Sequence, residues 1–306
     1  LLTNIDEPDP VAPDLGAWLM TLGAVRESSD LIYQAGLNGD LENFTIDLKQ
    51  LHNVVNYVAE LTLKSYPDLN IPMHSRWRHL SINNKDRWAE IVSKFCLTGD
   101  EKARVAFDLI IPSVLLDAGS GVHWRYWDQI SGMTIKRSEG LAIASLNAFL
   151  AGFFSSNTDQ PLYADQIQLC RITKRMFETA FQVNNKNPLD GVEGRAQLLN
   201  ALGQNLLDKP KIFGSINPRI GNLFDYLKQK SVCGKLKASD IFCGVLEGFG
   251  DIWPRRSLLN GLNLGDTWRH PVARSNYNQE GFVPFHKLSQ WLTYSLIELI
   301  IDAGIE

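Results

Sequence analysis

The residues best placed for chemistry lie in one stretch of the sequence, 115–147. Asp117 follows an apolar run and precedes Gly119 and Gly121, so a carboxylate stands where the backbone can turn sharply and approach a ligand closely. Aromatic and ionisable residues follow without interruption at 123–128. This combination predicts a pocket for a small polar ligand. A turn whose tryptophans fill the core would explain the same residues about equally well.

A basic segment in the same stretch opens a run rich in alanine and leucine. Ser138 lies in this segment, between Arg137 and Glu139, and is suited to cap a helix. The first amide groups of a helix can hold an anion. The segment therefore predicts a helix start that faces the ligand of Asp117.

Three short clusters combine histidine, tryptophan and arginine: 74–79, 123–125 and 268–270. Arginine matches phosphate or carboxylate with a planar fork, and tryptophan supplies a flat apolar wall. If the clusters converge, they form a site for an anionic, ring-shaped ligand. For each cluster alone, an arginine that stacks on tryptophan for structural reasons is the more common case.

The sequence predicts neither a metal nor a cofactor. No two histidines have the spacing that places two ligands on one helix face. The sequence also lacks a phosphate-binding GxxxxGKS loop, a GxSxG elbow and a dinucleotide fingerprint. Chemistry on nucleoside triphosphates or NAD is therefore disfavoured.

Composition restricts the class of protein further. A chain of 306 residues with 44% hydrophobic residues can bury a sizeable core, and its net charge of −4 argues against a nucleic-acid partner. The four cysteines are scattered, which favours reduced thiols in a cytoplasmic protein. The apolar runs are far shorter than the ~20 residues that span a membrane, so no membrane partner is expected. The oligomeric state stays open, as does any segment before Leu1.

The hydrophobic periodicity predicts a mainly α, single helical globule with at most a small irregular β element at 183–188 and 281–284. We expect one catalytic domain over 1–306, possible lobes at about 1–135 and 136–306, and an exposed lead-in at 1–13. The predicted helices are 15–37, 48–61, 86–95, 101–116, 164–181, 191–207, 222–229, 238–249 and 285–301. The helix at 101–116 delivers Asp117 and contains Pro112.

The last predicted helix carries two lines of residues at helical spacing. One line is apolar. The other is polar and aromatic, so we expect it to be interior and its charged members to find partners there. Its members are Lys287, Gln290, Trp291, Tyr294 and Glu298. An amphipathic surface helix is the alternative.

Several longer segments, read together, resemble the uracil-catabolism protein four family of fungi and bacteria. They are His74-Ser-Arg-Trp-Arg-His79, Pro112-Ser-Val-Leu-Leu-Asp-Ala-Gly119, Arg137-Ser-Glu-Gly-Leu-Ala142, Asn187-Pro-Leu with Glu193-Gly-Arg195, Gly265-Asp-Thr-Trp-Arg-His-Pro271 and Val283-Pro-Phe-His-Lys-Leu-Ser-Gln-Trp-Leu-Thr-Tyr-Ser-Leu-Ile-Glu298. The resemblance covers nearly the whole chain in order. It implies a role in a uracil-degrading route that opens the pyrimidine ring and releases urea, with a ribosylurea-type substrate.

A fainter similarity links the chain to the helical family that salvages queuine by cleaving queuosine phosphate, itself similar to helical DNA glycosylases. It rests on Asp117 with its aromatic neighbours, on the helix that begins near Glu139, and on the helix 195–207. It implies a glycosylase-like fold and hydrolysis of an N-glycosidic bond. In their last motif the queuosine enzymes have an aspartate about where this chain has Lys287.

Together these observations predict hydrolysis of the C1′–N bond of ribosylurea, as its 5′-phosphate, to urea and ribose phosphate. Asp117 would stabilise the positive charge on the ribose ring, and Glu139, His286 or Lys287 would assist the departure of urea. The expected substrate-binding residues are Arg76, His79, His123, Trp124, Tyr126, Ser138, Asp266, Arg269, His270, Gln290, Trp291 and Tyr294. Two alternatives remain: an amidohydrolase that acts on the ureido group, and a non-enzymatic ligand-binding or scaffold subunit of the pathway.

Overall fold

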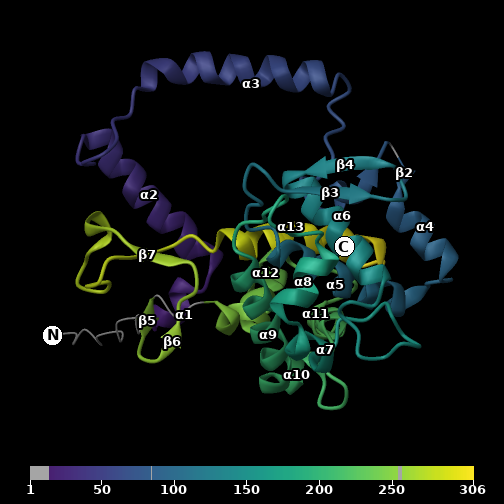
Figure 1. The fold of residues 1–306 in the computed structure, drawn as a ribbon. Helices are drawn as coiled ribbons and strands as arrows, with labels where there is room; N and C mark the ends of the chain where they lie inside the picture. Colours follow the sequence, from purple (N-terminus) through teal and green to yellow (C-terminus); the bar gives the residue numbers. More distant parts are fainter. Residues whose placement is uncertain (1–13, 84, 254–256) are drawn as a thin grey trace. The chain divides into compact units, whose positions relative to one another are not determined.

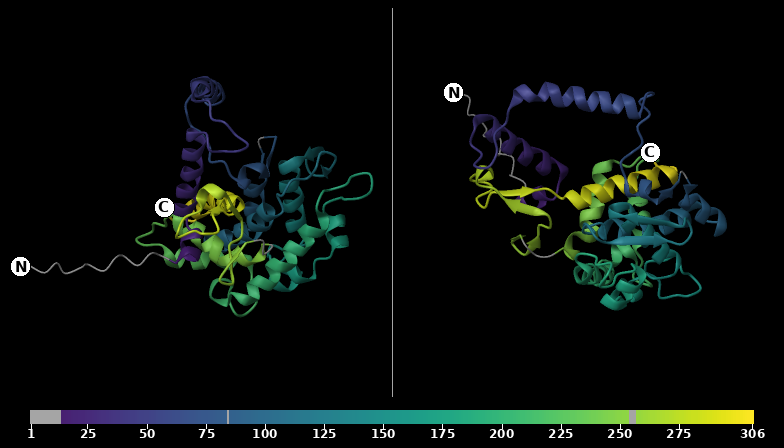
Figure 2. Two further views of the ribbon diagram at one scale, coloured as in Figure 1. Left: turned by 90° about the vertical axis from the view of Figure 1, so that its left-hand side faces the viewer. Right: turned by 45° about the horizontal axis from the view of Figure 1, so that its top comes forward.

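Two parts of the chain fold around separate cores. The computed structural model describes residues 14–83, 85–253 and 257–306. Within them, unit 1 comprises 14–65 and 257–286, and unit 2 comprises 66–253 and 287–306. Figures 1 and 2 show the elements of each unit. The predicted lead-in at 1–13 lies outside the described residues, and the expectation of a single catalytic domain stays a prediction.

Unit 2 is built mainly from helices that surround α5 (Gly99–Leu115), which is buried along most of its length. Its other α-helices are α4 (Arg87–Lys94), α6 (Arg137–Leu150), α7 (Gln166–Arg171), α8 (Lys174–Ala180), α9 (Val192–Asp208), α10 (Pro210–Phe213), α11 (Leu223–Lys230), α12 (Ala238–Phe249) and α13 (Lys287–Asp302). Its 3-10 turns are η2 (Arg76–Leu80), η3 (Ile220–Asn222) and η4 (Gly250–Ile252). Its strands form two antiparallel pairs, β1 (Ser81–Ile82) with β2 (Lys85–Asp86) and β3 (Arg125–Asp128) with β4 (Met133–Lys136).

Unit 1 has a much smaller core, centred on Leu19, Leu264 and Phe282. Its helical elements are α1 (Leu15–Leu19), α2 (Leu22–Asn38), η1 (Leu48–Gln50), α3 (Leu51–Ser65) and η5 (Pro271–Ala273). Its strands also pair antiparallel, β5 (Leu258–Leu259) with β6 (Leu262–Asn263) and β7 (Thr267–Arg269) with β8 (Phe282–Pro284).

The predicted mainly α fold is confirmed: the described residues contain thirteen α-helices, and each of their sheets has only two strands. Two predicted helices are each divided by a threonine. Thr21 accepts a hydrogen bond from Ala24 N at 3.1 Å, and Thr173 accepts one from Met176 N at 3.2 Å. Each threonine thus caps the start of a new helix. The helical spacing of apolar residues continues across each break, so the sequence pattern did not show it.

The small β elements differ from the prediction. The expected hairpin at 183–188 and 281–284 is not one unit: Asn184 bridges to Asn187, whereas β8 pairs with β7. The β3–β4 hairpin was not predicted. It lies beside α6 and turns part of the stretch 115–147 into two strands (Figure 1).

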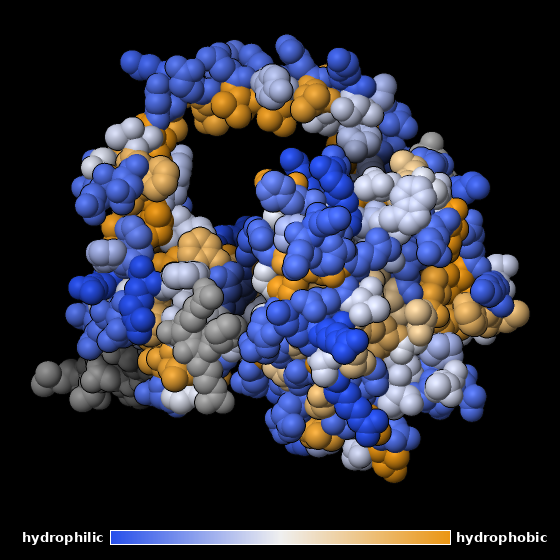
Figure 3. All heavy atoms as spheres, viewed as in Figure 1, coloured by the Kyte–Doolittle hydropathy of each residue, from blue (hydrophilic) through white to orange (hydrophobic). Residues whose placement is uncertain are grey.

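One helix of unit 1 leaves its apolar stripe in contact with solvent. The stripe on α3 includes Leu51, Val55, Val58 and Leu61, each more than half exposed. Figure 3 shows apolar side chains along one side of this helix and polar side chains along the other. Across the described residues, no helix combines the length and the apolar character that crossing a membrane would need.

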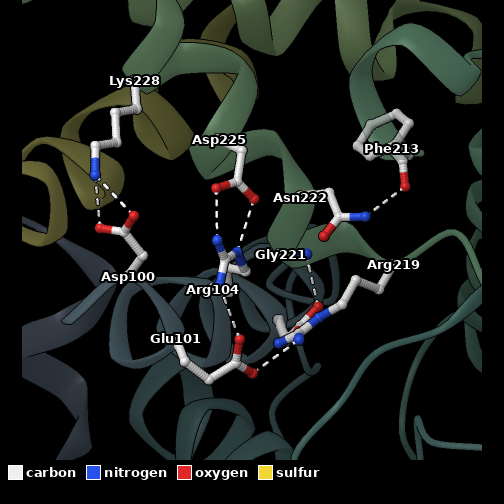
Figure 4. A network of polar contacts seen from close by, with 10 residues as sticks. Asp100, Glu101, Arg104, Phe213, Arg219, Gly221, Asn222, Asp225 and Lys228 are labelled. Atoms are coloured by element: carbon white, nitrogen blue, oxygen red, sulfur yellow. Dashed lines mark hydrogen bonds and ion pairs between the residues drawn. The ribbon is translucent and has the colours of Figure 1, made fainter. Parts of the chain in front are cut away.

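A buried ion pair ties α5 to the segment before α11. Asp108 has no exposed surface and pairs with the nearly buried Arg219, whose Nε donates to Asp108 Oδ2 at 2.8 Å. Gly221 N donates to Asp108 Oδ1 at 2.7 Å, and the guanidinium lies 3.6 Å from the ring centre of Tyr163. Burial raises the pKa of Asp108 to about 6, opposed by Arg219. Figure 4 shows the wider network around Arg219.

Removing this carboxylate charge should be costly. We expect Asp108→Asn to lower the free energy of unfolding by about 3 kcal/mol, because Arg219 would stay buried without its main counter-charge. The control is Asp100→Asn, which removes a half-exposed pair with Lys228 and should cost less than about 1 kcal/mol. Guanidinium denaturation measures both losses. Equal losses in the two variants would contradict this account.

Candidate functional site

The site in unit 2 is built around Arg76, whose side chain has no exposed surface. Its Nε donates to Ser113 Oγ at 2.9 Å. Its Nη1 donates to Ser138 O at 2.9 Å and to Ser138 Oγ at 3.0 Å, and it lies 3.0 Å from Asp117 Oδ2. Nη2 is buried and has no hydrogen-bond partner among the described residues. The guanidinium thus joins η2, α5 and α6, with the two N–H groups of Nη2 left over.

Asp117 follows the end of α5 and opens the predicted glycine turn. Gly119 and Gly121 have φ angles of 79° and 73°, in the region that favours glycine, so this prediction is confirmed. A Cβ atom on Gly121 would lie 2.5 Å from Asp190 Oδ2. The Asp117 side chain is 13% exposed, and its Oδ2 accepts a hydrogen bond from Ser138 Oγ at 2.7 Å.

The other carboxylate oxygen of Asp117 is not engaged. Both Arg76 and Ser138 bind Oδ2, and no described residue donates to Oδ1. Asp117 is therefore held in one orientation while Oδ1 keeps its acceptor capacity for a ligand.

The start of α6 differs from the expectation. Lys136 is the N-cap residue, and Ser138 is the second residue of the helix, so the prediction that Ser138 caps it is wrong. The helix begins at Arg137, whose φ is 54°, two residues before the start that an N-cap at Ser138 would give. The Ser138 hydroxyl is thereby free to bind Asp117.

Arg195 on α9 supports the glycine turn, and the sequence analysis assigned it no role in the site. Its Nε donates to Leu116 O at 3.2 Å, and its two terminal nitrogens donate to the carbonyl groups of Gly119 and Asp190. Burial lowers the pKa of Arg195, opposed by Asp117 and Asp190. The glycine-rich turn was the sequence signal that could have predicted a donor such as Arg195. The carbonyl groups of such a turn cannot all bond within regular secondary structure, so they need other donors.

His79 lies against the same cluster. Its Nδ1 is 3.4 Å from Arg76 Nη1 and 3.4 Å from Ser138 Oγ. Its ring is tilted against that of Trp291, with 6.2 Å between the ring centres. Glu139 is exposed in the first turn of α6, and its charge acts on both Arg76 and His79. Burial lowers the pKa of Arg76 to about 10, although Asp117 and Glu139 oppose the shift.

The segment that carries Arg76 is anchored to α13. Arg76 N donates to Ser295 Oγ at 3.0 Å. Ser75 Oγ and Arg78 Nη2 both donate to the carboxylate of Glu298. The expectation that Glu298 finds partners is confirmed. The cluster Arg76, His79, Asp117, Ser138 and Glu139 is the candidate site.

Comparison with known proteins places the chain in a family. The family model described as "Protein of unknown function (DUF1688)" matches residues 18–306. The chain belongs to the DUF1688 family. Uracil catabolism protein 4 of Lachancea kluyveri is 33% identical over 94% of this chain and 69% of its own length. Protein urg3 of Schizosaccharomyces pombe is 34% identical over 92% of this chain and 68% of its own length.

These relatives confirm the resemblance to the uracil-catabolism protein four family. No solved structure matches the chain. The glycosylase-like fold implied by the fainter similarity therefore stays a prediction.

In this DUF1688 chain, the predicted aromatic walls belong to the core. Trp124, directly before β3, and Tyr126, within β3, are both buried. Trp124 Nε1 donates to Phe181 O at 3.0 Å, and Tyr126 Oη accepts from Asn147 Nδ2 at 3.3 Å. His123 is exposed. These contacts favour the alternative in which the indole and phenol rings stabilise the fold.

The polar line of α13 is not interior as a whole. Lys287 and Tyr294 are exposed, while Gln290 and Trp291 are partly buried, so the expectation is wrong for the first two. The buried face of α13 contains Leu292, Leu296 and Leu299 of the predicted apolar line, together with flanking residues: Ser289, Thr293, Ser295 and Ile300. Small hydroxyl residues turn inward because their single polar group can bond to the backbone or to η2.

Four predicted site residues belong to unit 1. His286 is buried, and its Nε2 bonds to Leu19 O at 2.9 Å; burial lowers its pKa. Asp266 Oδ1 accepts from the Trp268 ring at 2.9 Å. The others also have partners: Arg269 pairs with Glu280, and His270 Nδ1 accepts from Val272 N. Their convergence with Asp117 stays a prediction.

The pair Arg76–Asp117 should show strong energetic coupling. We expect Arg76→Met and Asp117→Asn each to cost about 3 kcal/mol of stability, because each change leaves the partner charge without its counter-charge. The double variant should lose less than the sum, by about 1–2 kcal/mol, in guanidinium denaturation. The exposed pair Arg269–Glu280 provides the control cycle, with coupling below about 1 kcal/mol. Additive losses at Arg76 and Asp117 would show that the pair is not coupled.

Proposed function

We propose that this chain acts in uracil catabolism as an N-glycosyl hydrolase that releases urea from ribosylurea or its 5′-phosphate. Two observations support the proposal. The relatives that match nearly all of the chain include one named for uracil catabolism. The candidate site also holds an oriented, ion-paired carboxylate with one oxygen unused, at Asp117.

The unused oxygen distinguishes Asp117, which follows α5, from the buried carboxylate of Asp108 on α5, and this contrast carries the proposal. Both oxygens of Asp108 are occupied, one by Gly221 N and the other by Arg219. Asp108 also has no exposed surface, so a ligand cannot reach the acceptor capacity that its oxygens retain. Asp108 is therefore structural.

A third carboxylate nearby gives the same contrast. Asp128 has no exposed surface; its Oδ1 accepts from Asn147, and its Oδ2 accepts from Arg87 and from Ser131 N. It too is saturated by its own neighbours. Of these three carboxylates, Asp117 is the one with an oxygen to which no described residue donates.

The proposed chemistry uses that oxygen. As the C1′–N bond breaks, positive charge develops on the ribose ring, and a fixed carboxylate next to it stabilises the charge more strongly than water does. Water then adds its oxygen to C1′, and its proton ends on the urea nitrogen. Arg76 and Ser138 keep Asp117 in place, so little reorganisation is needed during the reaction.

Three residues were predicted to assist the departure of urea: Glu139, His286 and Lys287. Of these, Glu139 lies in the candidate site. Glu139 lies in the first turn of α6 next to Ser138, and its charge acts on His79. The Nε2 of His286 is engaged by Leu19 O in unit 1. Lys287 is exposed at the first residue of α13.

Asp117→Asn tests the proposal directly. We expect the purified variant to fold but to release urea from ribosylurea or its phosphate about 10³-fold more slowly, because the charge on the carboxylate is lost. Urea and reducing sugar are measured together. Asp190→Asn is the matched control: its exposed carboxylate lies against the same turn at Gly121, and turnover should stay near wild type.

Each rival reading gives a different result in this assay. Ammonia and carbon dioxide in place of urea would identify an amidohydrolase that acts on the ureido group. Binding without any turnover would identify a ligand-binding or scaffold subunit. Urea release by Asp117→Asn at the wild-type rate would remove Asp117 from the mechanism.

A further inference from the structure

The neighbours of His79 determine which ring nitrogen carries its proton. Arg76 Nη1 can only donate, so the Nδ1 of His79, 3.4 Å away, acts as the acceptor. Ser138 Oγ is also 3.4 Å from Nδ1, and because its proton is donated to Asp117 at 2.7 Å it could only accept from Nδ1. The Arg76 contact decides between the two neighbours, because hydrogen on Nδ1 would point at the positively charged guanidinium and its N–H group. This donor and acceptor logic assigns the neutral tautomer with hydrogen on Nε2. No described residue bonds to Nε2.

The charged groups around His79 keep it neutral. Burial and the guanidinium of Arg76 lower its pKa, and His74 on the same segment acts in the same direction. Glu139 from α6 and Asp117 from the end of α5 oppose the shift. The face toward α13 is covered by the uncharged ring of Trp291. Protonation would also place an N–H group of His79 against the N–H group of Arg76.

We propose that His79 is a catalytic residue that donates a hydrogen bond from Nε2–H to the carbonyl oxygen of the departing ureido group. The inference rests on the proposed function and adds a role to it. Arg76 fixes the tautomer, and Asp117, bound to the same guanidinium, faces the sugar. One guanidinium thus positions the group that stabilises the sugar and the group that stabilises the leaving urea.

The step is balanced without an acid. The electron pair of the C1′–N bond moves to the urea nitrogen, and the resulting negative charge spreads to the carbonyl oxygen. The Nε2–H bond stabilises that oxygen while His79 keeps its proton. The attacking water supplies the hydroxyl group for C1′ and the proton for the nitrogen, so no oxidant or reductant is required.

Three variants separate the donor from the ring. In His79→Gln the amide nitrogen can reach the place of Nε2, whereas in His79→Asn it reaches only the place of Nδ1. We expect kcat for urea release to fall about 10²-fold or more in His79→Asn and His79→Ala, but only about tenfold or less in His79→Gln. Equal losses in Gln and Asn variants would overturn the proposal.

The pH profile gives a second readout. The neutral imidazole is the active form, so wild-type kcat should rise with pH through a pKa below 6.5 and then stay level. His79→Gln cannot titrate and should lack this limb. A limb that persists unchanged in His79→Gln would also overturn the proposal, because another group would then cause it.

Nitrogen-15 NMR of the six histidines tests the inference without turnover. The signals absent from His79→Gln identify His79, and they should report hydrogen on Nε2. Methylurea, a substituted ureido probe, should shift them in the wild-type protein. Hydrogen on Nδ1, or no response to saturating methylurea, contradicts the role of His79. A response to methylurea without urea release from ribosylurea contradicts the proposed function instead.

Discussion

The structure of the candidate site depends on the complete burial of one guanidinium. Arg76 has no exposed surface, and a charge removed from water is tolerated only where acceptors and a counter-charge surround it. Ser113 on α5, Asp117 after α5 and Ser138 on α6 supply them, while Ser295 on α13 holds the backbone of Arg76. The helices α5 and α6, with the turn after α5, must therefore meet at this side chain, while α13 holds its backbone. Any arrangement that separates them leaves a buried charge unpaired.

This constraint also divides the chemical roles between the two groups proposed to react. A carboxylate that binds a guanidinium and a hydroxyl group through one oxygen is a fixed negative charge, well suited to an electron-poor sugar and poorly suited to moving protons. The imidazole of His79 accepts from the same guanidinium through the lone pair of Nδ1. Its proton is therefore on Nε2. The cation thus pairs with Asp117 and favours a neutral His79 at the same time. Two different functions follow from one buried positive charge.

Much of this arrangement was readable in the sequence, and the rest was not, for physical reasons. The glycines after Asp117 required a sharp turn, and helical periodicity identified α5, α9, α12 and α13. Local patterns could not show that Trp124 and Tyr126 point inward, because a strand alternates its faces and the β3–β4 pairing sets which face is buried. The partners of Arg76 were also hidden: Ser113 and Ser138 lie 37 and 62 residues from it, and a serine carries no signal of a distant partner.

The hydroxyl group of Ser138 has a role at this site that an apolar side chain could not take. Ser138 Oγ accepts from Arg76 Nη1 at 3.0 Å and donates to Asp117 Oδ2 at 2.7 Å, so one atom bonds to both members of the ion pair. A hydroxyl group can do this because it carries one proton and two lone pairs. Alanine offers neither function. In a chain of this kind each bond polarises the next, so the hydroxyl strengthens the attraction between guanidinium and carboxylate. Its small size also lets α6 approach Arg76 closely enough for the Ser138 carbonyl group to accept from the same Nη1 at 2.9 Å. A single small hydroxyl residue at the second position of α6 thus links the fold of the site to the orientation of its carboxylate.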